Sequence, residues 1–238
     1  MVGLAASLGT TASAQIFNTV SRGWISSIPE APDVVDTTND NYCTGFLNDP
    51  WQPFELRSFY IFDLPQSLER VYAADLELYL PSEGYVGGPS LEISFFDVDP
   101  ASAVALVEGR IGTPGLFEDL GTGECFGTFT VYPNDAGLFR SFLFWDPLVD
   151  RINESEGLFA LGCRLTRSGP DSEEFVFGYT GWAAEPADGH TYITLYVDDE
   201  DVPVGPVPEP VTSALCGVLT LLWAAFWRGR RRHRAVAN

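Results

Sequence analysis

The residues best suited to chemistry in this chain are aromatic side chains at alternate positions of apolar segments. Tyr79, Tyr192 and Tyr196, with Phe96, stand where a period-two pattern predicts the polar face of a strand. Rings exposed on such a face can stack on the apolar faces of sugars, so we take these residues as candidates for glycan binding. Packing against a second sheet or at a sheet edge explains the same rings equally well.

Acidic residues form two clusters that suit a divalent cation. They are Asp97 with Asp99 and the run Asp198–Asp201, and carboxylate oxygens are the ligands that Ca²⁺ prefers. Neither cluster has the spacing of an EF-hand loop, and a solvated acidic surface is the alternative. We expect no cofactor other than structural Ca²⁺ at one of these clusters.

The sequence contains no recognisable catalytic constellation. His190 is the one histidine before the C-terminal tail, and it has no G-x-S-x-G, H-E-x-x-H or phosphate-loop motif to accompany it. The chain has no Lys, which excludes Schiff-base chemistry. A glycosidase needs only two carboxylates in a cleft, so a glycan hydrolase remains a third hypothesis, after a structural role and a lectin-like role. We expect a protein that is not an enzyme.

Charge is divided sharply along the chain. The 238 residues contain 33 Asp and Glu against 13 basic side chains, all of them Arg. Residues 1–227 hold all 33 acids but only eight of the Arg, a formal charge of −25. A body this acidic repels phosphate backbones, which excludes nucleic-acid binding. Its charge is expected to keep an extracellular domain soluble.

The last residues combine an apolar segment with a basic cluster. Residues 211–227 are free of charge and as a helix would extend about 26 Å, close to the hydrocarbon thickness of a bilayer. A basic cluster beside such a span marks the cytoplasmic side. This cluster consists of Arg228, Arg230, Arg231, Arg232 and Arg234. We predict a transmembrane helix at 211–227 and a cytoplasmic tail at 228–238; a core helix and a nucleic-acid-binding arginine run are the alternatives.

Pro208, Glu209 and Pro210 end a Pro-rich linker, residues 202–210, directly before the span. The order of Pro-Glu-Pro, apolar helix and C-terminal arginine cluster is similar to the PEP-CTERM sorting signal that exosortases recognise in Gram-negative bacteria. This resemblance covers residues 207–234. It implies an exosortase as partner, an inner-membrane intermediate, cleavage near the motif, and delivery to the cell surface or the exterior.

Residues 1–14 are a candidate signal peptide. Ala12 and Ala14 flank Ser13 before Gln15, which is the small-residue spacing that signal peptidase cleaves. A basic n-region is missing, so we expect the natural start to lie upstream. A ragged N-terminus with small residues by chance is the alternative.

The body, residues 15–201, is predicted to be one domain of short strands. Apolar residues alternate with polar ones or form short runs between Gly, Pro, Asn and Asp turns. The strand candidates are 59–62, 74–80, 91–96, 126–132, 138–144, 158–161, 175–179 and 192–197. Only 101–107 and 147–155 have helical character. We therefore predict an all-β fold, a two-sheet antiparallel jelly-roll-like sandwich, followed by the single C-terminal helix.

Several segments resemble carbohydrate-binding-module-like jelly rolls, including those often found ahead of PEP-CTERM tails. They are NYCTG (41–45), RSFYIFDLP (57–65), VYAADLELYL (71–80), LFEDLGTGECFG (116–127) and NESEGLFALG (153–162). The resemblance covers residues 41–197, with Phe126 in place of a Tyr and Cys163 in place of a Gly. It marks the fold and carries no activity over to these segments. Together with the sorting signal, we expect a structural or adhesive protein of the exopolysaccharide layer, with a lectin-like carbohydrate-binding module as the alternative.

Local chemistry adds three expectations for these segments. Gly121, Gly123 and Gly127 are expected to allow a tight connection with positive φ. Asp63 and Asp119 are suited to accept hydrogen bonds from turn amides. Cysteines at positions 43, 125 and 163 allow one disulfide and one free thiol without deciding the pair.

Overall fold

The structure is a computed structural model, and the part of it that is described lies within the unit Met1–Asp199. The described residues are 13–28, 42–48, 53–110, 113–155, 157–166, 172–177 and 191–197. Ala12, His190, the cluster Asp198–Asp201, the sorting motif and everything after it lie outside these ranges. Within them, no helix has the length and apolar character needed to cross a membrane.

Most described residues belong to strands. The strands are β1 (Ser13–Ser26), β2 (Thr44–Leu47), β3 (Phe54–Leu64), β4 (Val71–Leu80), β5 (Tyr85–Val86), β6 (Leu91–Asp97), β7 (Cys125–Val131), β8 (Leu138–Phe144), β9 (Gly157–Thr166), β10 (Glu174–Val176) and β11 (Thr191–Val197). The helices are α1 (Pro100–Val107), α2 (Leu116–Asp119), the 3₁₀ turn η1 (Pro133–Asp135) and α3 (Leu148–Asn153).

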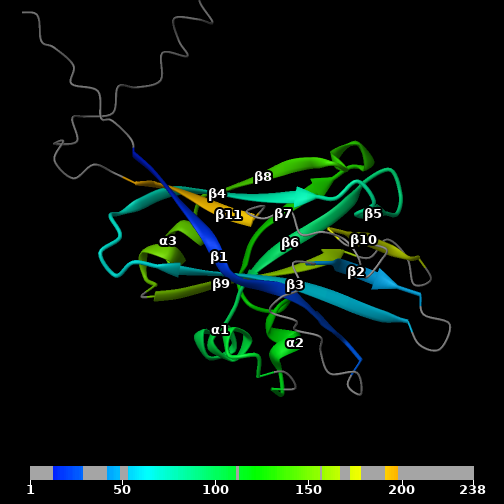
Figure 1. The fold of residues 1–238 in the computed structure, drawn as a ribbon, viewed down its shortest axis with the longest axis horizontal. Coiled ribbons are helices and arrows are strands. Elements are labelled where there is room, and N and C mark those ends of the chain that lie inside the picture. Colours follow the sequence, from blue (N-terminus) through cyan, green and yellow to red (C-terminus); the bar gives the residue numbers. More distant parts are fainter. Residues whose placement is uncertain are drawn as a thin grey trace, which may run out of the picture. The chain divides into compact units, whose positions relative to one another are not determined.

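Two antiparallel ladders share strand β1. The first half of β1 pairs with β11, and this ladder continues through β4 to β8. The second half pairs with β3, and that ladder continues through β9 and β6 to β7. A register shift between Thr19 and Ser21 marks the place where β1 passes from one ladder to the other (Figure 1). Every pairing is antiparallel, so the prediction of an all-β antiparallel fold is confirmed.

The ladders pack against each other through a common core. Phe95 of β6 joins them, because its ring centroid lies 5.2 Å from that of Phe142 and 5.5 Å from that of Phe144, both on β8. The alternation predicted at 74–80, 91–96 and 192–197 is confirmed, since the apolar member of each alternating pair is buried. The opposite face of each strand is therefore free to carry function.

Helices α1 and α2 cover the outer face of the β3–β9 ladder. Leu106 of α1, with Leu116 and Leu120, packs on Phe59 and Ile61 of β3. Figure 1 shows both helices on the side of this ladder away from β4, β8 and β11. The two predicted helical segments correspond to α1 and α3, whereas the sequence analysis does not predict α2.

The strand that connects the ladders, β1, is also not predicted from the sequence pattern. Burial alternates along the strand, but its apolar residues do not follow that alternation, since Ile16 and Val20 are exposed whereas Gly23 and Ile25 are buried. The sequence therefore shows no period-two pattern of apolar residues here. Ala14, at the predicted cleavage site, lies within β1 opposite Tyr196. Cleavage after Ala14 would leave Gln15 as the first paired residue.

The three cysteines of the described ranges are all free thiols. Cys43 and Cys163 are buried, and desolvation raises the pKa of each to about 12. Cys125 is exposed. The disulfide that the odd count allows is therefore not formed among them.

Candidate functional site

The outward face of the β1-β11-β4-β8 ladder brings the three predicted tyrosines together. Tyr192 and Tyr196 alternate with core residues of β11, and Tyr79 does so on β4, so all three point away from the core. The buried residues of α1, α2 and α3 pack elsewhere, so no helix of the described ranges covers this face. We call it the tyrosine face and define it by Tyr72, Tyr79, Phe139, Tyr192 and Tyr196.

Rings at both ends of the tyrosine face support each other. The ring centroids of Tyr72 and Tyr196 lie 6.3 Å apart, and those of Tyr79 and Phe139 lie 5.3 Å apart. Tyr72 remains 37% exposed and Phe139 47% exposed. Aromatic pairs at such distances stabilise each other's orientation. The face therefore presents ordered, partly exposed rings to solvent.

Two carboxylates lie between these ring pairs. Asp75 and Glu77 occupy the outward positions of β4, opposite Thr194 and Tyr192 of β11. The Tyr192 hydroxyl donates a hydrogen bond to Glu77, and this bond, followed by desolvation, raises the pKa of Tyr192 to about 12. The Ser141 hydroxyl donates to Asp75 Oδ1 over 2.6 Å. Apolar rings with a few fixed polar groups are the usual composition of a binding surface for small polar ligands.

Phe96, the fourth ring singled out in the sequence, lies on the other ladder. It occupies an outward position of β6, where β6 pairs with β9, and is partly exposed. The structure thus separates Phe96 from the tyrosine face. The alternation predicted correctly that its side chain leaves the core but contained no information about which ladder carries it.

The acidic pair predicted to bind Ca²⁺ has protein partners. Arg151 Nε donates to Asp97 Oδ1 over 2.9 Å, and the Asp99 side chain caps α1 by accepting from the amide of Ala101. Across the described ranges, no group of three or more His, Cys, Asp or Glu is arranged to hold a metal ion. The second cluster, Asp198–Asp201, lies outside those ranges.

Two of the segments that resemble the jelly-roll modules contact each other. Gly162 of β9 lies so close to the 116–127 segment that a Cβ built on it would be 2.7 Å from the Cα of Leu120. A Cβ on Gly123 would clash with the carbonyl oxygen of Asp97. Asp119 accepts a hydrogen bond from the amide of Asp99 over 3.0 Å, as predicted for a turn carboxylate.

The prediction that these glycines adopt positive φ is wrong. Gly121, Gly123 and Gly127 do not appear among the glycines with positive φ, which include Gly115 just before them. Their common property is close approach: a Cβ on Gly121 would lie 3.0 Å from side-chain atoms of Arg57 and Arg164, and one on Gly127 would lie 3.0 Å from the ring of Phe129. The sequence shows that glycine recurs in this segment. The structure shows that the reason is packing, because neighbouring atoms leave little room for a side chain there.

An ion-pair network beside this contact escaped the sequence analysis. Glu55 Oε1 accepts from Arg57 Nε over 2.9 Å and from Arg164 Nε over 3.0 Å. The Arg57 side chain is 5% exposed, lies 4.0 Å over the ring of Phe117 and donates to the Phe117 carbonyl. The sequence feature that could have indicated this network is Arg57, the single cation within the apolar run of β3. Several of its partners come from distant segments, so the sequence does not identify them.

No protein-family model matches the chain, and no curated protein matches it.

Proposed function

We propose that this chain is an exported surface protein whose β-domain adheres to extracellular polysaccharide through the tyrosine face. The observation that carries the proposal is the juxtaposition of Tyr79, Tyr192 and Tyr196 on one face that no helix of the described ranges covers, with Asp75 and Glu77 between them. Rings can stack on the apolar faces of sugars, while carboxylates accept hydrogen bonds from sugar hydroxyls. An extended face suits a polymer better than an isolated small molecule.

The strand order supports a jelly-roll sandwich as the scaffold. The eight main strands in chain order are β1, β3, β4, β6, β7, β8, β9 and β11. In that numbering one ladder runs 1-8-3-6 and the other 2-7-4-5. Eight strands in two facing sheets, connected in this interleaved way, form a jelly roll. Such a scaffold leaves one outer face free when helices cover the other.

We propose binding without catalysis. Asp75 and Glu77 already accept hydrogen bonds from Ser141 and Tyr192. Both carboxylates lie on an open face, whereas a glycosidase places its acid and its nucleophile or base on opposite sides of a scissile bond. Their arrangement suits recognition of hydroxyl groups.

Replacing Tyr192 with Ala is expected to weaken polysaccharide binding by at least about tenfold, or about 1.4 kcal/mol. The ring is lost from the centre of the face, and Glu77 loses its fixed donor. Glycan arrays and polysaccharide pull-downs with the full chain would measure the effect. Tyr192→Phe, which keeps the ring, is expected to lose less.

Tyr132→Ala provides the matched control, because Tyr132 is a 49% exposed tyrosine that follows β7 of the other ladder and does not belong to the tyrosine face. It should bind as the unmodified chain does. Absence of any glycan signal, or equal binding by Tyr192→Ala and Tyr132→Ala, would exclude adhesion through this face.

Export and sorting form the second half of the proposal. They are supported by the sequence order Pro208-Glu209-Pro210, apolar span and arginine cluster. The exosortase would act on the linker that follows the β-domain, with the span holding the chain in the inner membrane until cleavage. The product is a domain at the cell surface or in the exterior, where an exopolysaccharide partner is available.

Intact mass and C-terminal peptide mapping are expected to show a native form that ends near Pro210. An exosortase-deletion strain should retain the arginine tail in its membranes, because the span is then not removed. If both strains keep residues 211–238, the tail is an ordinary anchor, and the link to the exopolysaccharide layer loses its main support.

A further inference from the structure

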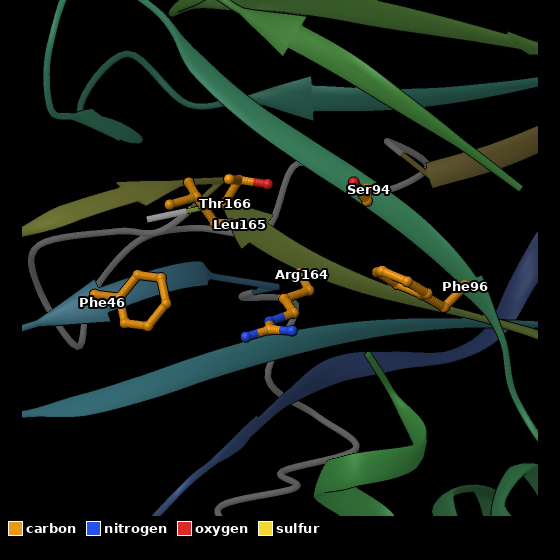
Figure 2. Close-up of a pocket in the computed structure, with 6 residues that line it drawn as sticks. All are labelled: Phe46, Ser94, Phe96, Arg164, Leu165 and Thr166. Carbon is orange, nitrogen blue, oxygen red and sulfur yellow. The ribbon is translucent and has the colours of Figure 1, made fainter. Parts of the chain in front are cut away.

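A cavity of about 340 Å³ opens beside β6 and β9, on a different part of the domain from the tyrosine face (Figure 2). Its lining residues are Phe46, Ser94, Phe96, Arg164, Leu165 and Thr166. The volume lies at the lower end of the range found for small-molecule sites, roughly 300–1,000 Å³. It is thus large enough for one small ring with its substituents.

The strand register brings the lining residues of β6 and β9 together. Ser94 of β6 stands directly opposite Arg164 of β9, and Phe96 stands opposite Gly162. The backbone of Leu120 packs directly on Gly162 and fills the surface there, and neither residue lines the cavity. The cavity therefore lies next to the close contact that fixes the 116–127 segment to the ladder.

Arg164 is held in place but retains free donors. Its Nε donates to Glu55, and Glu55 is itself fixed by the buried side chain of Arg57. The Arg164 side chain is 43% exposed, and its two terminal nitrogens have no acceptor among the residues that the structure describes. A guanidinium with free terminal N–H groups recognises a planar carboxylate by parallel hydrogen bonds.

The other lining residues define the rest of the ligand. Figure 2 shows Arg164 between Phe46 and Phe96, whose rings provide apolar walls. Ser94 shares a hydrogen bond of 2.7 Å with Thr128, and Thr166 contributes a second hydroxyl to the rim. The complementary ligand has an apolar ring face, hydroxyl groups and one carboxylate.

We propose that this cavity binds a uronate, that is, a sugar residue that carries a carboxylate. The carboxylate accepts hydrogen bonds from the terminal nitrogens of Arg164, the ring stacks on Phe96, and the hydroxyls bond to Ser94 and Thr166. Glu55 and the exposed Glu118 offset Arg57 and Arg164, but Glu92 and Glu174 stand opposite the lining residues Thr166 and Phe46, so no excess of positive charge attracts an anion. Recognition therefore depends on the directed donors of Arg164, and we expect millimolar affinity that falls with added salt.

Calorimetry with the full chain tests the site, with monomeric glucuronate as probe and glucose as its neutral counterpart. Glucuronate should bind saturably and glucose should not, and acetate should compete poorly because it lacks the ring. Arg164→Gln is expected to lose at least about tenfold in affinity, and Arg164→Lys to retain part of it, since Lys keeps the charge but not the planar donor pair.

Two control variants test whether glucuronate binds in the cavity and not elsewhere on the domain. Arg110→Gln removes an exposed arginine paired with Glu108 outside the cavity, and Tyr192→Ala disrupts the tyrosine face. Both should bind glucuronate normally, and an unchanged melting temperature of Arg164→Gln would confirm that its fold is intact. The proposal is overturned by equal affinity for glucose, by full competition from acetate, by undiminished binding in a folded Arg164→Gln, or by loss of binding in Tyr192→Ala.

Discussion

Replacing Glu55 with Gln is expected to lower the free energy of unfolding by about 3–5 kcal/mol, the usual cost of breaking a buried ion pair on one side. Glu55 is the carboxylate shared by Arg57 and Arg164, and its side chain is 13% exposed. The Arg57 side chain, 5% exposed, would keep its charge under the 116–127 segment with a neutral neighbour. Denaturant unfolding followed by tryptophan fluorescence would measure the loss.

Glu118→Gln is the matched control for this experiment. Glu118 Oε2 also bonds to Arg57, over 3.3 Å, but its side chain is 68% exposed. Solvent-exposed ion pairs contribute at most about 1 kcal/mol, so this variant should unfold nearly as the unmodified chain does. Equal effects of the two substitutions would mean that burial of the network does not determine its contribution.

A double substitution separates the charge from the shape of the site. Combining Glu55→Gln with Arg57→Met removes the buried charge together with its partner, and a well-packed apolar replacement of a buried pair is often neutral. The double variant should therefore recover much of the stability that Glu55→Gln loses. If it is less stable than Glu55→Gln alone, the stacking of Arg57 on Phe117 contributes more than the ion pair.

Gly162→Ala is expected to destabilise the domain by about 3 kcal/mol, at the upper end of the cost of overpacking. The added Cβ would lie 2.7 Å from the Cα of Leu120, and backbone atoms on both sides cannot rotate away as a side chain would. The 116–127 segment has to lift from β9, which exposes Leu120 and the cluster it shares with Phe59. Thermal unfolding gives the size of the loss, and hydrogen exchange should show faster exchange in this segment.

Gly88→Ala provides the comparison, because the atom nearest to its added Cβ lies 4.0 Å away. This exposed turn position should change stability by no more than about 0.5 kcal/mol. If Gly162→Ala behaves like Gly88→Ala, the contact between β9 and the 116–127 segment is looser than the structure describes.

Alternation in the sequence predicted which residues enter the core and which leave it. The positions Leu76, Phe95 and Ile193 are buried as expected, and Tyr79 and Tyr192 point outward. A period of two follows from the pleat of a single strand. It contains no information on strand partners, which is why the three tyrosines could be placed outward but not on a common face.

The features that escaped prediction depend on contacts between distant segments. Arg164 and Glu55 are separated by 109 positions in the chain, and no local pattern connects them. The glycines of the 116–127 segment were recognised, but their role was misassigned because turn geometry and close packing favour the same residue. β1 was missed because apolar residues such as Ile16 and Val20 stand at its exposed positions, which removes the sequence pattern that identifies a strand.

The position of β11 determines how the domain would bear mechanical load. This strand is the last described element before the predicted linker at 202–210, and it has antiparallel partners on both sides, β1 over 192–197 and β4 over 191–197. A pull on the chain beyond Val197 acts along the strand, so both rows of hydrogen bonds are strained together in shear instead of being peeled apart in succession. Tyr192 and Tyr196 stand on this same strand. Tension between a bound polymer and the linker would therefore pass along β11 itself, and the hydrophobic core would carry little of it.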